Sequence, residues 1–322
     1  MRHIFYSKCI FGGFCMDKSK KIIGFDSHFD HAALEEAIGE LAYRYDFIDV
    51  STLAYTIMGK SIPIITLGKG KKSVLYVGAH HGMEWISSAL LIRFINEYCE
   101  EYKRAGTLFG VSTRFLDMTR KIYVIPMLNP DGVEYSIHGI CSDHVLYDRL
   151  VKMNGGSKDF TKWQANARGV DLNHNYNSGF EEYKLIEREL GIFGGSRTRF
   201  SGENSESEPE TSALCNFVRI QAPEMALTFH SQGEEIYYTS GGRCAKNSLS
   251  VGKVLSRLCG YKLSLPEGAA AYGGFTDWFI EEFDKPSFTI ECGRGENPLP
   301  FSDLDEIYHR LRQMLFLAPT LI

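Results

Sequence analysis

The chain has 322 residues, of which 44% are apolar and 23% are charged. These proportions are typical of folded globular proteins and argue against a disordered or fibrous chain, so we expect a single α/β domain over residues 21–322. The formal net charge is only −5, and the chain has no long basic block. Nucleic-acid binding therefore has no electrostatic support.

The first 20 residues contain an apolar stretch that is interrupted by Lys8 and lacks the small-residue cleavage site of a secretory signal. We interpret residues 1–20 as a disordered extension. The eight cysteines are scattered without a CxxC pair, which favours reduced thiols. A run of about 18 apolar residues is absent, so we expect no transmembrane helix. These features predict a cytoplasmic protein, with secretion as the alternative.

The first predicted elements are a helix, a hairpin and a strand followed by a long helix. Residues 30–45 have apolar positions at helical spacing behind Asp30, a residue type that caps helices. Residues 47–58 and 61–68 are β-like and are joined at Gly59-Lys60, which predicts the hairpin. Residues 73–79 form a continuous apolar run, and the segment after it has one apolar helical face.

The same alternation of strands and helices continues to the end of the chain. It predicts strands at residues 121–128, 225–230 and 287–291, and helices at residues 207–221, 246–259, 275–283 and 303–316. Strands that alternate with helices imply a mixed, mostly parallel sheet covered on both faces.

Four polar residues follow or end the apolar strands. His81 and Glu84 come after the run at residues 73–79, His230 ends the strand at 225–230, and Glu291 ends the strand at 287–291. Ligands bind at the carboxyl ends of the strands in sheets of this kind. Two histidines and a carboxylate are the ligand set of a catalytic zinc site, and a His and a Glu three apart at a helix start reach one ion.

Each of these assignments has an alternative. His80 adjoins the first histidine and is the other candidate ligand, although it lies four residues before the glutamate instead of three. His230 could be a core histidine with satisfied hydrogen bonds. Glu291 could pair with Arg294, but a carboxylate that ends an apolar strand is costly to bury without a function.

The chain contains seven further sequence motifs in a fixed order. They are GAHHGMEW, LNPDG, RGVDLNHNYN, SEPET, TFHSQGE, GGFTDW and FTIECGRGENPLP, and the similarity that they carry covers residues 24–315. In these motifs and their order the chain resembles the zinc carboxypeptidase family, and within it the branch of γ-D-glutamyl-L-diamino acid endopeptidases and murein peptide amidases. The resemblance implies a mixed, mostly parallel twisted sheet of about eight strands with helices on both faces, and one zinc ion at its carboxyl edge.

The resemblance also implies roles for individual residues. His81, Glu84 and His230 are expected to bind the Zn²⁺ ion, and Glu291 is expected to take a proton from the activated water and pass it to the leaving amine. Arg168 is the candidate that stabilises the oxyanion, unless it is a surface residue. Asn173 matches the substrate-contacting asparagine of the family, and the alternative role for it is to cap a turn.

Two departures from the family pattern bear on the substrate. His174 stands where the exopeptidases carry an arginine that clamps a C-terminal carboxylate, and imidazole is the poorer clamp. Ala269 stands where they carry a tyrosine, and Tyr272 is the nearest phenol. Arg294 is expected to line the substrate cleft, and a local turn network is the alternative.

Together these features predict a zinc-dependent peptidase whose substrate is a peptide or muropeptide. The resemblance favours cleavage of the γ-D-glutamyl to diaminopimelate bond of bacterial cell-wall peptides. A conventional metallocarboxypeptidase or a related deacylase is the alternative enzyme. A third hypothesis is a protein that binds muropeptides without cutting them.

Overall fold

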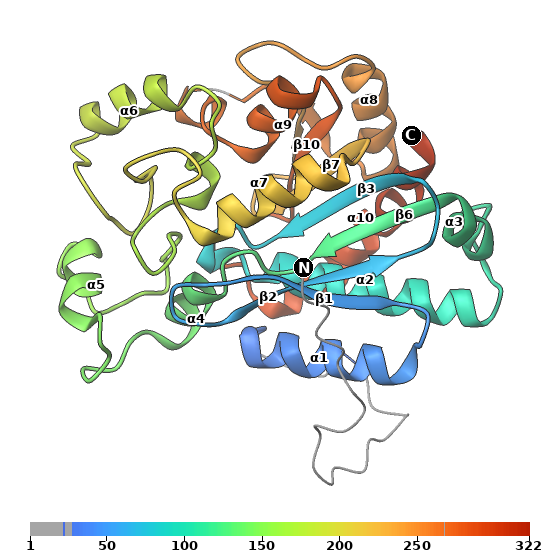
Figure 1. Ribbon diagram of the computed structural model, residues 1–322, viewed down its shortest axis with the longest axis horizontal. Coiled ribbons are helices and arrows are strands. Elements are labelled where there is room, and N and C mark those ends of the chain that lie inside the picture. Colours follow the sequence, from blue (N-terminus) through green and yellow to red (C-terminus); the bar gives the residue numbers. More distant parts are fainter. Residues whose placement is uncertain (1–21, 23–27, 267) are drawn as a thin grey trace, which may run out of the picture.

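The structure is a computed structural model and describes residues 22, 28–266 and 268–322. The extension predicted for residues 1–20 lies outside the described residues. Within the described part, eight strands form one twisted sheet in the order β1-β2-β6-β3-β7-β10-β8-β9 (Figure 1). This mixed sheet confirms the predicted fold class.

The central strands of the sheet run parallel to one another. They are β6 (Arg120–Ile125), β3 (Lys72–Gly78), β7 (Met225–His230) and β10 (Ser287–Glu291). Their carboxyl ends therefore meet at one edge. On one side, β1 (Asp49–Tyr55) and β2 (Ser61–Leu67) form the hairpin that the sequence predicted, and β2 pairs antiparallel with β6.

The other side of the sheet ends in short strands that the sequence did not indicate. They are β8 (Glu235–Tyr237), which pairs antiparallel with β10, and β9 (Lys262–Ser264), which is parallel to β8. A separate two-stranded ribbon is formed by β4 (Thr107–Leu108) and β5 (Val111–Ser112). Strands of two or three residues are too short for an alternating pattern to be recognised.

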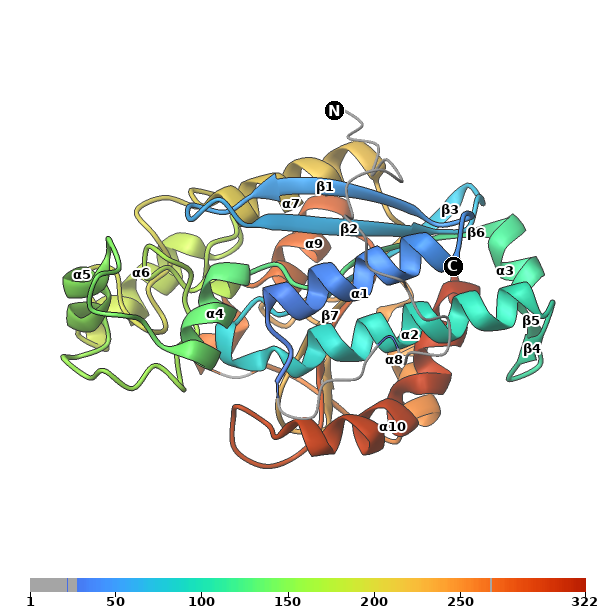
Figure 2. The ribbon, with the colours of Figure 1, turned by 90° about the horizontal axis from the view of Figure 1, so that it is seen from below.

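Helices cover both faces of the sheet (Figure 2). One face is covered by α1 (His31–Arg44), α2 (Ile86–Lys103), α8 (Ser248–Cys259) and α10 (Leu304–Leu317), and the other by α7 (Pro209–Gln221) and α9 (Phe275–Phe283). Strand β3 contributes to both cores, since Tyr76 faces the first group of helices and Leu75 the second. Burial on both sides explains why its sequence is continuously apolar.

The segment between β6 and α7 forms a lobe beyond the carboxyl ends of the strands. It contains α4 (Pro130–His138), α5 (Tyr147–Met153), the short 3₁₀ helix η2 (Leu172–His174) and α6 (Phe180–Glu189), seen at the left of Figure 1. Trp163 is fully buried in a third small core within this lobe. The sequence predicted only a long polar region here.

The remaining elements are short. They are η1 (Gly82–Glu84) after β3, α3 (Thr113–Thr119) before β6, η3 (Gly268–Ala271), η4 (Phe301–Asp303) and η5 (Ala318–Leu321). No helix in the described part of the chain is both long and apolar enough to cross a membrane.

Candidate active site

Two neighbouring strands deliver His230 and Glu291 to the same edge of the sheet. These two residues are the last of β7 and β10, and they are partners in the parallel register of the two strands. His81 lies three residues beyond the end of β3, which borders β7 on its other side, and Glu84 ends the helical turn η1. The topology thus assembles four residues that are far apart in the sequence.

The side chains of His81, Glu84 and His230 converge on one point. Nδ1 of His81 lies 2.9 Å from Oε1 of Glu84, and Nδ1 of His230 lies 2.9 Å from Oε2 of the same carboxylate. The two Nδ1 atoms are 3.4 Å apart. One potential ligand atom from each of the three residues lies within 4.8 Å of the others, and all three residues are buried. This is the donor set that a catalytic zinc ion takes.

The hydrogen bonding of His81 suits a metal ligand. Its Nε2 lies 3.1 Å from Oδ1 of Asp171. In a neutral imidazole, Nε2–H donates to this carboxylate, which leaves the lone pair of Nδ1 free for a cation. Glu84 is a carboxylate at neutral pH, and its two oxygens face Nδ1 of His81 and Nδ1 of His230. The donor set therefore offers two imidazole nitrogens and an ionised carboxylate.

Asp171 lies beside the candidate metal ligands and was missed by the sequence interpretation. Burial would raise the pKa of this carboxyl, but His81 and His174 hold it well below its ordinary value. Its second oxygen accepts a 2.9 Å hydrogen bond from the backbone N–H of Arg199, so both sides of the carboxylate are fixed. The signal available in the sequence was its place within the RGVDLNHNYN motif.

The neighbouring His80 is held differently from His81. Its ring is fully buried and stacks on His230, with 5.2 Å between the centroids. Its Nε2 lies 3.0 Å from the hydroxyl of Tyr176. Burial, followed by the charges of the two other histidines, lowers its pKa well below the ordinary value, which keeps the ring neutral. Glu84 thus contacts a ring nitrogen of His81, whereas His80 packs against the ring of His230.

Glu291 lines the same pocket as His81 and His230. Burial, followed by the negative charge of Glu84, raises the pKa of Glu291 to about 8. A cation held by the neighbouring side chains acts in the opposite direction. Arg294 does not pair with Glu291, because its guanidinium lies 2.6 Å from Oε2 of Glu234. The alternative that Glu291 is half of a structural ion pair with Arg294 is thus not realised.

Asn173 and His174 also line this pocket. Oδ1 of Asn173 accepts a 3.2 Å hydrogen bond from the N–H of Phe275, at the start of α9. The ring of His174 stacks on Tyr183, with 3.9 Å between the centroids, and its Nδ1 lies 3.0 Å from the carbonyl oxygen of Tyr272. Nδ1 therefore carries the proton. Burial lowers the pKa of His174, so its ring is neutral at pH 7.

The rest of the pocket wall is mostly polar. Among the described residues, no arginine or lysine lines it, and the other side chains are Tyr237, Thr239, Pro266, Thr276, Asp277 and Thr289. Burial raises the pKa of Asp277 to about 7, and its Oδ2 accepts a 3.2 Å hydrogen bond from the N–H of Gly274. The sequence interpretation did not select any of these residues.

Two predicted site residues lie outside this pocket lining. The side chain of Arg168 is 50% exposed, and its Nη1 lies 3.7 Å from Oε1 of Glu208. The side chain of Arg294 is 76% exposed. The roles of both arginines in catalysis or substrate binding stay predictions. The side chain of Ala269 lies outside the described parts of the chain.

Two glycines allow the metal-ligand turn to touch α4. A Cβ on Gly82 would lie 2.3 Å from the carbonyl oxygen of Gly132, and a Cβ on Gly132 would lie 2.4 Å from that of Ala165. Any larger residue would force the backbones apart. The side-chain amide of Asn129, the N-cap of α4, also joins these two segments, since its Nδ2 donates a 3.0 Å hydrogen bond to the carbonyl oxygen of His80. The GAHHGMEW and LNPDG motifs therefore form one packed unit behind Glu84.

The fold, the three converging side chains with metal-binding atoms and the adjacent carboxyl have the arrangement expected of a metallopeptidase site. Residues 34–314 match the sequence model of the zinc carboxypeptidase family, and the chain belongs to this family. It is therefore a zinc-dependent peptidase.

Two curated relatives and one solved structure show the extent of the similarity. The chain is 30% identical over 288 residues to γ-D-glutamyl-L-diamino acid endopeptidase 1 of Lysinibacillus sphaericus, which covers 89% of this chain and 71% of the relative. It is 30% identical over 292 residues to the uncharacterized protein YqgT of Bacillus subtilis, covering 90% and 77%. The structure of thrombin-activatable fibrinolysis inhibitor shares the fold, with a TM-score of 0.68, 20% identity, and coverage of 90% and 73%.

Proposed function

We propose that the protein hydrolyses the amide bond between γ-D-glutamate and diaminopimelate in bacterial cell-wall peptides. In this proposal His81, Glu84 and His230 bind the zinc ion, and Glu291 is the general acid/base. The observation that carries the substrate assignment is the state of His174, which is neutral and held by Tyr272 at the position where exopeptidases of the family clamp a carboxylate.

The proposed chemistry divides between the metal and the protein side chains. Zinc bound by this donor set acidifies water and polarises the carbonyl of the scissile amide. The carboxyl of Glu291, beside His81 and His230 in the pocket, takes up a proton and returns it to the nitrogen of the leaving amine. Asp171 keeps His81 in the tautomer that presents Nδ1.

The pocket supports a substrate that is not held by its C-terminal carboxylate. A guanidinium binds a carboxylate through two parallel hydrogen bonds, whereas a neutral imidazole already committed to a carbonyl has one acceptor nitrogen left. None of the described residues that line the pocket supplies a permanent positive charge in its place. The similarity to an endopeptidase that acts on γ-D-glutamyl-L-diamino acid bonds agrees with this chemistry.

The experiment compares two substrates of equal length, a γ-D-glutamyl-diaminopimelate tripeptide and an all-L tripeptide with a free C-terminus. The zinc-loaded protein is incubated with each, and mass spectrometry identifies the products. The proposal predicts that the amide between glutamate and diaminopimelate is cut and that the all-L peptide stays intact. Release of the C-terminal residue from the all-L peptide alone would instead identify a conventional carboxypeptidase.

A further inference from the structure

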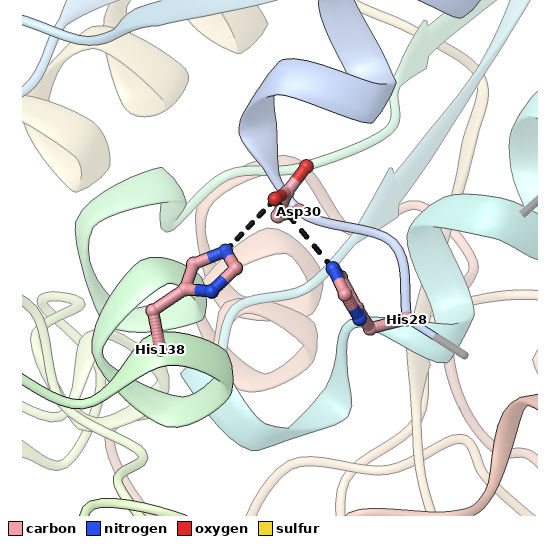
Figure 3. A group of neighbouring side chains, drawn as sticks. All are labelled: His28, Asp30 and His138. Atoms are coloured by element: carbon pink, nitrogen blue, oxygen red, sulfur yellow. Dashed lines mark hydrogen bonds and ion pairs between the residues drawn. The ribbon is translucent and has the colours of Figure 1, made fainter.

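A second group of side chains with metal-binding chemistry lies outside the catalytic pocket. His28, Asp30 and His138 gather where the chain enters α1, beside the C-terminal end of α4 (Figure 3). Oδ2 of Asp30 lies 2.8 Å from Nε2 of His138 and 3.9 Å from Nε2 of His28. One potential ligand atom from each residue lies within 4.8 Å of the others. None of the three residues lines the catalytic pocket.

The carboxylate of this group is held in place by the helix that it caps. Oδ1 of Asp30 accepts a 2.8 Å hydrogen bond from the N–H of Ala33, in the first turn of α1. With Oδ1 committed to the cap, Oδ2 is directed at the two histidines, as Figure 3 shows. An aspartate side chain is ionised at neutral pH, so this oxygen is available as an anionic ligand.

The position of His138 is set by a contact between α4, the helix that carries it, and the start of α1. Glu134 lies one helical turn before it on α4, so the two side chains share a face. Oε1 of Glu134 accepts a 3.1 Å hydrogen bond from the N–H of His31, the first residue of α1. Its other oxygen lies 3.5 Å from the ammonium of Lys60. This face of α4 therefore packs against the start of α1, and His138 lies beside Asp30.

We propose that His28, Asp30 and His138 form a second metal site, which binds Zn²⁺ and clamps the residues before α1 to the end of α4. Two imidazoles and one carboxylate suit zinc and disfavour Ca²⁺ and Mg²⁺, which take oxygen ligands. The side chains of His28 and His138 are 42% and 45% exposed, so water can complete the coordination. We assign the site a structural role, because it joins residues 28–30 to the end of α4 and its three residues lie outside the catalytic pocket lining.

The competing explanation is a plain hydrogen bond between His138 and Asp30. Ligand atoms at about 2.0–2.1 Å from a tetrahedral zinc ion lie about 3.3 Å apart, so His28 must close its 3.9 Å gap to Asp30 when the metal binds. His28 lies ahead of α1, outside any helix or strand, and its side chain is 42% exposed. His28 is therefore the residue that separates the two explanations, because a His138–Asp30 hydrogen bond does not need it.

The test measures bound zinc per chain after dialysis against a series of buffered free-zinc concentrations. Wild-type protein is compared with His28→Asn, His138→Gln and the control His309→Gln, which alters an exposed histidine on α10. The proposal predicts about two zinc equivalents for wild type and control, and about one for both cluster variants. Each cluster variant should keep the zinc ion of the catalytic site, and this remaining bound zinc shows that the variant is folded.

A second measurement follows the thermal unfolding midpoint as free zinc rises above the level that saturates the catalytic site. Since metal that binds only the folded state stabilises it, the midpoint of wild type should continue to rise and that of His28→Asn should not. The proposal is overturned if wild type saturates at about one equivalent, or if His28→Asn binds the second ion and gains stability as wild type does.

Discussion

Oδ1 of Asp171 lies 3.1 Å from Nε2 of His81, on the side of the ring opposite the nitrogen that faces Glu84. Because a carboxylate at Nε2 fixes the proton there, Nδ1 is left as the ligand atom. The other oxygen of Asp171 is bonded to the N–H of Arg199, so the carboxylate cannot swing away from the ring without losing a second hydrogen bond.

The first prediction concerns this carboxylate. Asp171→Asn should weaken zinc binding by about 10–100-fold, since removing such an outer partner typically costs this much affinity. Zinc competition with a fluorescent chelator measures the change, and Asp143→Asn, which alters an exposed aspartate, is the control. Unchanged zinc affinity in Asp171→Asn would show that the carboxylate does not orient the ligand.

The second prediction concerns the missing carboxylate clamp. His174→Arg should raise kcat/KM by about tenfold for peptides with a free C-terminus, relative to the same peptides with a C-terminal amide, because a guanidinium binds carboxylate through paired hydrogen bonds. His174→Gln, which lacks the charge, should leave this ratio unchanged. If both variants change the ratio of kcat/KM between free and amidated peptides equally, the residue at position 174 does not select the substrate through its charge.

The third prediction is a pH dependence of stability that originates outside the active site. Burial, followed by the nearby Glu208, raises the pKa of Glu210 from 4.5 to about 8. The folded state therefore holds this proton more tightly than the unfolded state, so the contribution of Glu210 to stability is complete only below the unfolded pKa of 4.5 and is lost as pH rises from there to about 8.

Replacing this residue by an uncharged amide should remove that loss. Urea unfolding at pH 5 and pH 8 should show a smaller decline for Glu210→Gln than for wild type, by on the order of 1–4 kcal/mol. Glu203→Gln, at an exposed glutamate, should follow wild type. If all three proteins decline equally, Glu210 is ionised at neutral pH in the folded state.

The fourth prediction concerns the contact between η1 and α4. Gly82→Ala places a methyl group 2.3 Å from the carbonyl oxygen of Gly132, and backbone atoms cannot turn away as a side chain can. We expect about 1–3 kcal/mol of destabilisation together with weaker zinc binding, because Glu84 lies in the same turn. The matched control is Gly110→Ala, where no atom lies within 4 Å of the added methyl group and the positive φ alone imposes strain. Equal zinc affinity in both variants would contradict the coupling.

The sequence predicted the site residues that end or closely follow the central strands of the sheet. A strand buried on both faces reads as an apolar run, so the positions of β3, β7 and β10 were evident, and with them the placing of His81, His230 and Glu291. The helix behind Asp30 was predicted for a similarly local reason, since the structure confirms that this side chain caps α1.

The parts that were not predicted depend on contacts between distant segments. Asp171 contacts His81 across 90 residues of sequence, and its place within the RGVDLNHNYN motif does not by itself show which residue it contacts. His28 and His138 also lie far apart in the sequence, and they come together where α4 packs against the start of α1. Arg168 was assigned from its place in a motif, whereas its position in the structure follows from the surrounding loops and Glu208.

We propose that Glu291 moves the proton at a zinc site that cuts cell-wall peptides. The most direct measurement is mass spectrometry of muropeptides incubated with wild type or Glu291→Gln, with the zinc content of both proteins determined on the same samples. We expect wild type to separate glutamate from diaminopimelate, and Glu291→Gln to keep its zinc but to be about 10²–10⁴-fold slower. Cleavage at an equal rate by both proteins, or muropeptides left intact by zinc-loaded wild type, would contradict it.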